Sequence, residues 1–547
     1  MKKLLKRLCS AMVAAVMVMT MAPAAFAADG GAQFQNGPYL LAPKTNSMVV
    51  VWESTEKVSA TIAYGTDESK LCDPIKVEID ADAPDFKGSK MNLFHYKLDN
   101  LTPGTRYYYE VKLEGGATCK ASFKTLSEKP DQIRLITLSD SHIFATRAEL
   151  DQAIKEFDPD LLLHCGDMVE GTGAQAEQFS FWFQGKVEND YIHSYPVVYS
   201  SGNHDQGGVY FNTYVYSIQD EEYGAEVEGD SSFNYAGLHI VTMNSNPWGL
   251  FQMNSEATGQ KADAATIKTI DNAMNWLKKD LATDAAKNAD FRLIFMHHPV
   301  SDAYTKRYIP AVIEPGKVDL LLSGHTHSYA RAVSSNPAVG AGTIYLTHQD
   351  ARTYNKKGDF FYITSTPGSG VLDVKNYGAT AAGQESKVAN ETLVAKDKQQ
   401  LSWSDISITP STVLYNGEVT VTAKVTNNGK GLAAAVIPVV DNGTTRYLYK
   451  FEDGIVTLDP GKSATLTGTL RMETLGTHTL KLADKTVSVN VKYRPTTFDY
   501  TNIRTQQGNG KTSDMNSNIL HIKADVVNIG NDAGTGTAEF KVNGVTV

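Results

Sequence analysis

Short apolar runs with alternating polar positions dominate the chain between about residues 35 and 126. They are separated by turn-forming residues such as Asn100, Pro103 and Gly104. Alternation with a period of two is typical of strands that bury one face. The pattern therefore predicts a small β-sandwich over residues 28–130. Its expected strands include Met48–Trp52, Ala60–Tyr64, Arg106–Lys112 and Ala121–Lys124.

From Ile133 onward, apolar strands alternate with segments of helical spacing, which predicts an α/β domain over residues 131–385. Its expected strands are Ile133–Leu138, Leu161–Leu163, Phe291–Phe295, Val318–Leu322 and Thr343–Leu346. One expected helix uses Leu150, Ile154 and Phe157. A longer one carries an apolar stripe, which we interpret as core packing; its members are Ile267, Ile270, Met274, Leu277 and Leu281, with Trp276 beside them.

The last part of the chain returns to a β-strand pattern and contains an internal duplication. A polar segment predicts a linker over residues 386–403, and a β-sandwich is expected over residues 404–493. The sequence of Val425–Gly429 recurs, with changes, 101 residues later, as does that of Asn442–Gly443. Residues 494–547 are therefore interpreted as a partial second copy, which is too short to build the same sandwich alone.

The N-terminus has the features of a secretory signal peptide over residues 1–27. A basic start precedes the apolar run Ala11–Met21 and the small-residue cleavage site Ala25–Ala27. Its removal takes away four basic residues and moves the formal net charge from −10 to −14. We expect a secreted, extracellular protein without a transmembrane anchor. Its acidic charge disfavours nonspecific binding to nucleic acid.

Three cysteines lie outside the predicted signal peptide. Cys72 and Cys119 fall in the same predicted sandwich, and export would permit a disulfide between them, but the sequence leaves their pairing open. Cys165 ends an apolar strand and is interpreted as a buried packing residue. No cysteine-based zinc site is expected.

Five short polar segments each follow an apolar strand, where loops converge in α/β sheets. They offer carboxylate, imidazole and amide ligands, which suit borderline and hard divalent metals and trivalent iron. A single His-x-His pair would be weak support for a metal site, whereas five segments in order are far more specific. The segments are Asp140–His142, Gly166–Asp167, Gly202–Asp205, His297–Pro299 and Gly324–His327.

This order of segments resembles the calcineurin-like metallophosphoesterase superfamily, over roughly residues 131–380. The preceding sandwich, of fibronectin type III type, together with the segments at His297–Pro299 and Gly324–Arg331, is similar to the purple acid phosphatase branch. The resemblance implies an α/β/β/α catalytic sandwich that binds two metal ions. It places Asp140, His142 and His327 on one ion and Asn203, His297 and His325 on the other, with Asp167 bridging them.

The sequence departs from the purple branch at one position. A tyrosine follows the bridging aspartate by three positions in that branch, whereas this chain has Glu170, and it adds His142. A ferric site held by tyrosinate is therefore doubtful, and the two ions are expected to be Fe, Mn or Zn. Such a pair would activate a hydroxide for attack on phosphorus. His204 would protonate the leaving group, with Asp205 orienting its ring or else capping a turn.

Other residues near the motifs have less certain roles. Substrate binding is expected from Asn203 and His204. His298 either contacts the substrate or packs, and His164 and Arg331 stay equally open. The segment Gln206–Tyr235 is expected to form a rim that selects the leaving group.

The resemblance predicts a secreted hydrolase of phosphate mono- or diesters. An alternative is a catalytically silent surface protein, because residues 404–547 look like bacterial cell-adhesion immunoglobulin-like repeats; these modules would bind a cell-wall or surface component. The complete set of predicted ligands argues against a silent protein. A nuclease is a third hypothesis, disfavoured because no basic stripe with aromatic residues is evident.

Overall fold

The computed structural model describes residues 31–546, apart from 82–84, 87–88, 143–146, 171–178, 180–181, 185–189, 206–209, 250–262, 301–304, 306–307, 314–315, 334–342, 350–359, 378–389, 396–399, 432, 436, 449–455 and 508–519. The predicted signal peptide lies outside the described residues. The chain divides into two compact units. The first comprises Met1–Val333 and Thr343–Ala395, and the second comprises Ser334–Gly342 and Lys396–Val547.

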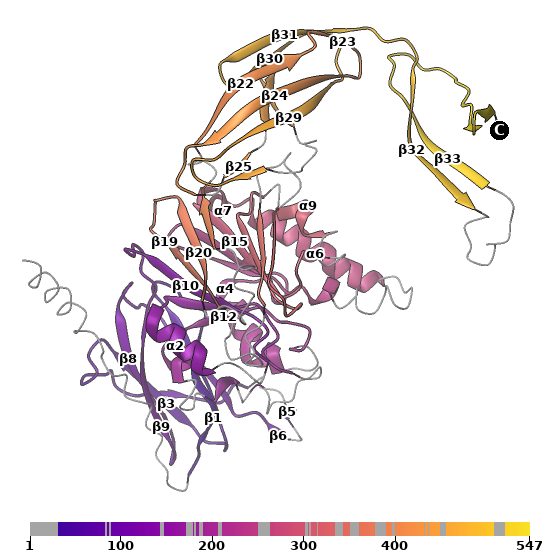
Figure 1. The fold of residues 1–547 in the computed structure, drawn as a ribbon. Coiled ribbons are helices and arrows are strands. Elements are labelled where there is room, and N and C mark those ends of the chain that lie inside the picture. Colours follow the sequence, from indigo (N-terminus) through magenta and orange to yellow (C-terminus); the bar gives the residue numbers. More distant parts are fainter. Residues whose placement is uncertain are drawn as a thin grey trace, which may run out of the picture. The chain divides into compact units, whose positions relative to one another are not determined.

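The first unit begins with the expected β-sandwich (Figure 1). Its first sheet has the order β1(Phe34–Leu41), β2(Met48–Ser54), β7(Leu93–Leu98), and its second sheet has the order β4(Ile75–Val77), β3(Ala60–Gly65), β8(Arg106–Leu113), β9(Thr118–Lys124). The short strands β5(Asp85–Phe86) and β6(Ser89–Lys90) pair in antiparallel orientation. Between the sheets, Trp52 stacks on Phe94 with ring centroids 5.3 Å apart. The alternation of apolar residues builds this core.

Two six-stranded sheets form the centre of the first unit. One has the order β12(Val197–Tyr199), β11(Leu161–His164), β10(Ile133–Leu138), β19(Phe360–Ser365), β20(Val371–Tyr377), β21(Glu391–Val394). The other has the order β13(Ser231–Tyr235), β14(Leu238–Thr242), β15(Phe291–Phe295), β16(Leu320–Ser323), β18(Ile344–Thr347), β17(Ala330–Val333). The strands β10, β11 and β12 run parallel, as do β14, β15, β16 and β18.

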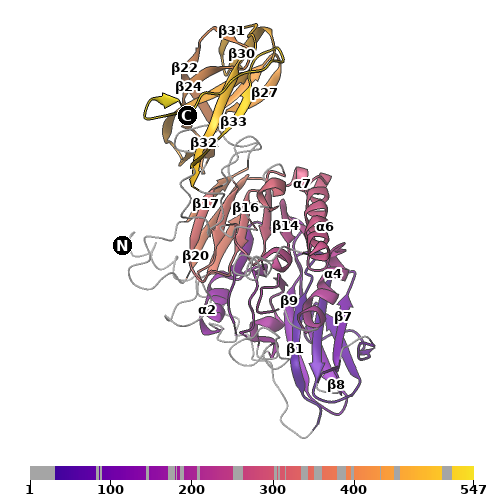
Figure 2. The same ribbon diagram turned by 90° about the vertical axis from the view of Figure 1, so that its right-hand side faces the viewer.

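Helices cover these sheets, which confirms the predicted α/β class (Figure 2). α2(Arg147–Phe157) packs Leu150 and Ile154 against the first sheet, and α6(Ala264–Asp280) packs Ile270 and Leu277 against the second. Ile267, expected in the apolar stripe, is 46% exposed because it lies in the first turn of α6. The shorter helices are α4(Ser217–Tyr223), α7(Asp284–Asn288), α9(Pro310–Ile313), η1(Asp190–His193) and η2(Asn212–Tyr216), the last a π-helix.

The N-terminal sandwich and the central sheets share one hydrophobic cluster. It contains Tyr39 and Val51 from the sandwich together with Phe183, Tyr214 and further residues of the central domain. The rings of Tyr39 and Phe183 stack with centroids 4.3 Å apart. The sandwich is therefore packed into the first unit by a common core.

The second unit holds a β-sandwich whose core is a separate apolar cluster. One sheet has the order β22(Leu401–Thr409), β24(Gly417–Asn427), β29(Ser463–Met472). The other has the order β23(Thr412–Leu414), β31(Lys485–Lys492), β30(Gly476–Leu482), β26(Ile437–Asp441), β27(Thr444–Leu448), and β25(Ala433–Ala435) pairs with β28(Val456–Leu458). Alternate residues of β24, such as Val421 and Val425, are fully buried.

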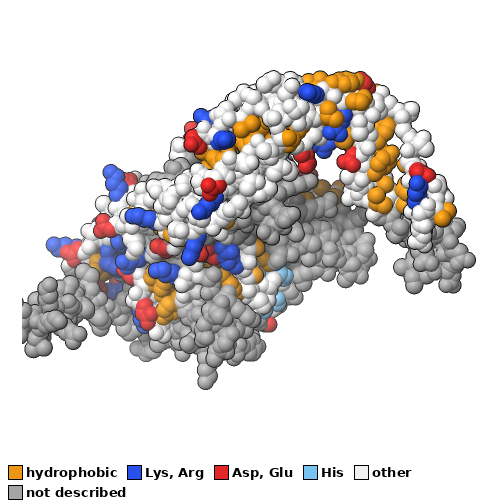
Figure 3. Space-filling model, turned by 45° about the horizontal axis from the view of Figure 1, so that its top comes forward, with side chains coloured by type: hydrophobic (Ala, Val, Ile, Leu, Met, Phe, Trp, Pro, Cys, Tyr) orange, Lys and Arg blue, Asp and Glu red, His pale blue; other side chains and the backbone are white. Residues whose placement is uncertain are grey.

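The sequence duplication is repeated in backbone geometry. β32(Phe498–Gln507) pairs with β33(Leu520–Asn528) as β22 pairs with β24, and each ladder has a bulge, next to Asp405 (φ 52°) or Asn502 (φ 49°). The second copy also includes β34(Lys541–Val542) and β35(Val545–Thr546). Val425 is buried in the first copy, whereas its counterpart Val526 is 52% exposed. Figure 3 shows apolar side chains at the surface of the strand pair β32–β33.

The described cysteines are all free thiols, so Cys72 and Cys119 do not form a disulfide in this structure. Cys165 is fully buried, as expected of a packing residue. Among the described residues, no helix combines the length and apolar character needed to cross a membrane.

Candidate metal centre

The five predicted segments follow the carboxyl ends of five strands. Asp140 and His142 follow β10, Asp167 follows β11, Asn203 and His204 follow β12, His297 follows β15, and His325 and His327 follow β16. Because the strands run parallel within each sheet, their carboxyl ends reach a common edge. The structure brings all seven predicted metal ligands together there.

Five of these side chains sit on left-handed backbone. The φ angles are 53° at Asp140, 44° at His142, 55° at Asp167, 74° at His325 and 51° at His327. Residues with a Cβ atom rarely adopt this conformation, and it persists where surrounding contacts determine it. Here the contacts include a hydrogen bond from the His142 N–H to the Asp167 carbonyl, at 2.9 Å.

One group of donors consists of Asp140, His142, Asp167 and His327, whose ligand atoms all lie within 4.8 Å of one another. His327 Nε2 lies 3.2 Å from Asp140 Oδ1 and 3.3 Å from His142 Nε2. His142 Nδ1 lies 3.1 Å from the Val169 carbonyl, so Nδ1 carries the proton and Nε2 points to the group.

A second group consists of Asp167, His297 and His325, again with ligand atoms within 4.8 Å. His297 Nε2 lies 3.1 Å from Asp167 Oδ2, and its Nδ1 faces the Cys165 carbonyl at 2.9 Å. Asn203 Oδ1 completes the group, 3.1 Å from His297 Nε2 and 2.9 Å from His325 Nδ1. Asp167 belongs to both groups.

The charges of the two groups are strongly linked. Burial alone would lower the pKa of His297, but the nearby Asp167 and Asp140 carboxylates raise it to about 9. Burial likewise opposes ionisation of Asp140, yet its bond to His327 and the charge of His297 hold its pKa below the usual range. Burial and the neighbouring His297 charge lower the pKa of His325 to about 4. These pKa values of Asp140, His297 and His325 apply to the protein without metal ions.

Two glycines allow the loops to approach one another closely. A Cβ atom at Gly202 would lie 2.0 Å from Asp167 Oδ1, and one at Gly324 would lie 1.9 Å from Ser139 Oγ. These two positions therefore hold one loop of the site against the next.

The expectation that Asp205 orients His204 is wrong. The Asp205 carboxylate accepts hydrogen bonds from the backbone N–H groups of Gly202 and Asp167, each at 2.8 Å. It also accepts from the N–H groups of Met168 and Val169. His204 Nδ1 instead faces the carbonyl oxygen of Glu170, at 2.5 Å. Asp205 caps the turn that carries Asp167, the alternative considered from the sequence.

Asp205 is itself electrostatically unusual. Burial and the neighbouring Asp167 carboxylate raise the pKa of Asp205 to about 7, although the backbone N–H groups of Gly202 and Met168 act in the opposite direction. Its carboxylate couples the Gly202–Asp205 segment to the Gly166–Asp167 segment. Sequence reasoning missed this link because its partners are main-chain atoms.

Glu170 replaces the tyrosine expected from the purple branch and lies beside the additional histidine. Its Oε2 is 2.9 Å from His142 Nδ1, on the ring edge that faces away from the donor group. The two departures from the purple pattern are therefore in contact. The Val169 carbonyl accepts the Nδ1 proton, so the Glu170 carboxylate places a negative charge beside this ring edge without forming a hydrogen bond to it.

His298 and His164, which also lie near the motifs, are both buried. His298 lies under His325, with ring centroids 4.5 Å apart, and its Nδ1 is 2.9 Å from Ser245 Oγ. It therefore packs behind the donor groups. His164 accepts a hydrogen bond from the Gly166 N–H at 3.1 Å and lies 2.9 Å from Ser141 Oγ. Burial lowers its pKa to about 3, so it supports two of the loops as a neutral imidazole.

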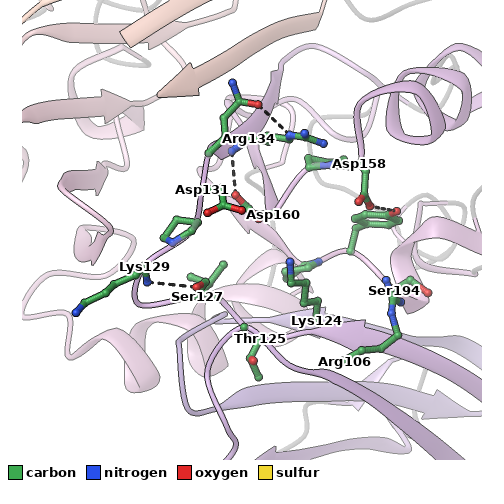
Figure 4. Close-up of a pocket in the computed structure, with 17 residues that line it drawn as sticks. Arg106, Lys124, Thr125, Ser127, Lys129, Asp131, Arg134, Asp158, Asp160 and Ser194 are labelled. Carbon is green, nitrogen blue, oxygen red and sulfur yellow. Dashed lines mark hydrogen bonds between the residues drawn. The ribbon is translucent and has the colours of Figure 1, made fainter. Parts of the chain in front are cut away.

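Two remaining features lie apart from the donor groups. The Arg331 guanidinium pairs with Glu391 on strand β21. A cavity of about 360 Å³ opens between the sandwich and the central domain, where Arg106, Lys124 and Lys129 line it, and none of its lining residues is a predicted site residue (Figure 4). This cavity is not the predicted reaction site.

Carboxylate, imidazole and amide donors gather at the ends of parallel strands, around one shared aspartate, and this arrangement suits a metal-dependent hydrolase. Residues 133–329 match the calcineurin-like phosphoesterase family. Residues 38–125 match the purple acid phosphatase N-terminal domain. The chain therefore contains a calcineurin-like phosphoesterase domain preceded by a purple acid phosphatase N-terminal domain, the domain pair of the purple-acid-phosphatase-like branch.

Solved structures give weaker likenesses. PhoD has a TM-score of 0.46 at 11% identity, covering 78% of this chain and 92% of that chain. A predicted phosphoesterase from Streptococcus pneumoniae has a TM-score of 0.24 at 9% identity, and the match covers 48% of this chain and 98% of that chain. Vps29 from Entamoeba histolytica has a TM-score of 0.23 at 11% identity, and the match covers 48% of this chain and 99% of that chain. No curated protein sequence matches the chain significantly. The assignment therefore rests on the two family matches.

Proposed function

We propose that this protein is a secreted phosphoesterase that uses two metal ions to hydrolyse phosphate mono- or diesters. One observation carries the proposal: two groups of metal-ligand side chains share a single residue, Asp167. A carboxylate shared in this way can bridge two ions with its two oxygens. The catalytic unit in this proposal is residues 131–385.

The donors fit such a centre chemically. Asp140, His142 and His327 would hold one ion, and His297, His325 and Asn203 the other, all through nitrogen or oxygen atoms. When bound, the two ions would activate water and neutralise charge on the phosphoryl oxygens. Fe, Mn and Zn all suit this donor set. The carbonyls that bind the distal ring nitrogens of His142 and His297 fix the orientation of both imidazoles.

His204 is placed to act on the leaving group. Its Nδ1–H donates to the Glu170 carbonyl, so Nε2 faces the centre, 4.0 Å from Asp167 Oδ2. The side chain is 28% exposed, similar to that of His327 at 31%, whereas Asp140, His142 and Asp167 are buried. A proton held on Nε2 can therefore pass to the departing alkoxide oxygen of a substrate at the surface of the site.

The proposal extends to location and substrate source. The basic and apolar N-terminal segment supports export, and the net charge of −14 without that segment disfavours long polyanions as substrates. We infer a small phosphoester from outside the cell as the substrate. The C-terminal β modules would then attach the enzyme to a cell-wall or surface component.

The test is to replace Asp167 with Asn and measure hydrolysis of nitrophenyl monoester and diester substrates, with bound metal quantified. The parent should hold about two ions and turn over at least one substrate, and the variant should lose ions and nearly all activity, because an amide cannot bridge two cations with two anionic oxygens. Asp271→Asn, on the exposed face of α6, is the matched control. A folded, metal-loaded parent without turnover would favour a binding module.

A further inference from the structure

The π-helix η2 follows the loop of Asn203 and His204 and carries two buried tyrosines, two positions apart. π-Helices are rare and occur frequently at functional sites. Tyr214 and Tyr216 are both almost fully buried, and their hydroxyl groups reach in different directions. One contacts the metal-centre loop, and the other contacts the N-terminal sandwich.

The Tyr216 hydroxyl holds the start of the metal-centre loop. It accepts a hydrogen bond from the Ser201 backbone N–H at 2.8 Å and donates to Ser201 Oγ at 3.1 Å. Ser201 Oγ also accepts from Asn246 Nδ2 at 2.9 Å. Ser201 lies only two residues before Asn203, so a shift of Ser201 would move the Asn203 amide.

The Tyr214 hydroxyl fixes the other side of η2 to the sandwich. It donates to Glu53 Oε2 on β2 at 2.8 Å, and the same oxygen accepts from Asn36 Nδ2 on β1. Tyr39, also on β1, donates its hydroxyl to the Tyr214 backbone carbonyl at 2.7 Å. Two sandwich residues, Glu53 and Tyr39, therefore bind Tyr214 directly, and Asn36 holds Glu53.

Aromatic packing makes this connection stiff. The Phe211 ring meets the Tyr216 ring edge to face, with centroids 4.7 Å apart, and Phe183 stacks on Tyr39. These residues belong to the hydrophobic cluster shared by the sandwich and the central domain. Because buried, close-packed side chains resist displacement, the position of β1 and β2 is transmitted to η2.

We propose that Tyr216 is a positioning residue through which the N-terminal sandwich sets the place of the Asn203 amide in the metal centre. The inference rests on the proposed function, because it takes Asn203 as a metal ligand. The sandwich thereby supports the chemistry without contributing a side chain to it. Outer residues that orient metal ligands commonly change metal affinity by about 10- to 100-fold when they are replaced.

The experiment measures the affinity of each of the two sites for Mn²⁺ by competition with a chelating dye, together with kcat and KM for a nitrophenyl ester at saturating Mn²⁺. The variants are Tyr216→Phe, which removes only the hydroxyl, and Tyr214→Phe, which breaks the bond to Glu53. The matched control is Tyr362→Phe, whose hydroxyl donates to the Ala153 carbonyl at 3.0 Å. Circular dichroism and urea unfolding check that each variant is folded.

Tyr216→Phe should weaken one of the two Mn²⁺ sites by about tenfold and leave KM for the ester at saturating Mn²⁺ unchanged, because the Ser201 N–H loses its partner. Tyr214→Phe should shift the same site by a smaller factor, and the control should stay within about twofold of the parent. Equal affinities in all four proteins would overturn the inference while leaving the proposed function intact. A parent that binds none of Mn²⁺, Zn²⁺ and Fe²⁺ would instead count against both.

Discussion

Individual residues at the metal centre are held in conformations that their side chains disfavour. Asp140, His142, Asp167, His325 and His327 all occupy the left-handed region, which Asn, Asp and glycine tolerate better than other residues. Each lies two to four residues beyond the end of a buried strand, so the strand fixes the backbone before the turn begins. The left-handed turns direct both members of each Asp-x-His or His-x-His pair to the same centre.

The different contacts of His204 and Asp205 lead to opposite kinetic expectations. His204→Ala should slow alkyl phosphoesters by about a hundredfold or more and nitrophenyl esters much less, because only the alkoxide requires a proton donor. Asp205→Asn should slow both substrates equally and lower the unfolding midpoint in urea, because one acceptor oxygen of the buried turn is lost. Paired rates on the two substrates check this. If Asp205→Asn slowed alkyl esters more than nitrophenyl esters, Asp205 would have to orient the His204 ring after all.

Asp220 predicts a pH dependence outside the metal centre. Burial, aided by the charge of Glu228, raises its pKa from 3.8 to about 7, although the Gly229 N–H acts in the opposite direction. Between these values the folded carboxyl keeps a proton that the unfolded one releases, so stability from this group falls as the pH rises and is fully lost above about 7.

Asp220→Asn should therefore raise the melting temperature by an amount that grows from about pH 4 to about pH 7 and then levels off. Thermal unfolding of the parent and the variant across this range measures the difference. Asp271→Asn, at an exposed position on α6, serves as the control. A difference that stays constant with pH would contradict the raised pKa.

At the scale of elements, the duplication provides an internal comparison of one turn in two environments. Asn427 donates to the carbonyls of Gly431 and Leu458, each at 2.8 Å, and accepts from the Gly429 N–H. Asn528 repeats the bonds to Gly530 and Asp532. Asn427 is fully buried, whereas Asn528 is exposed. The sequence repeat thus conserves a turn while the burial around it changes.

Asn427→Ala should destabilise the second unit by about 1–3 kcal/mol, because three buried backbone groups lose their partner. Asn528→Ala should have a much smaller effect on its own strand pair, because water can replace the lost bonds. Hydrogen exchange followed by mass spectrometry would show faster exchange across β24 and β29 in the first variant. Similar increases in exchange in both variants would mean that burial does not decide how much the hydrogen bonds of this turn stabilise the protein.

The sequence predicted elements better than it predicted the contacts within the site. Apolar runs located β2, β3 and β10 to within two residues, and motif order located the seven residues that converge. The bounds of β16, Leu320–Ser323 instead of Val318–Leu322, and the exposure of Ile267 differ from expectation because tertiary packing decides where an element begins and ends. The hydrogen-bond partners of His204 and Asp205 are main-chain atoms. Every residue has a backbone carbonyl, and nearly every residue has an N–H group, so the sequence does not indicate which of them a side chain will bind.

At the scale of the whole molecule, the first unit combines two regions that match different families. Residues 38–125 and 133–329 match separate families, yet Tyr39 and Val51 share a core with Phe183 and Tyr214. Domain organisation read from the sequence separates them near residue 130. Apolar alternation shows that a strand face is buried but does not identify which element covers it, so this common core could not be predicted.

The shared core also constrains the order in which a nascent chain can fold. A ribosome releases β1 and β2 more than a hundred residues before Phe183 and Tyr214, which cover their outer apolar face. During that interval the early strands present Tyr39 and Val51 to water and to other nascent chains. The sandwich therefore reaches its final packing only when the segment that carries Phe183 and Tyr214 is present to cover this face.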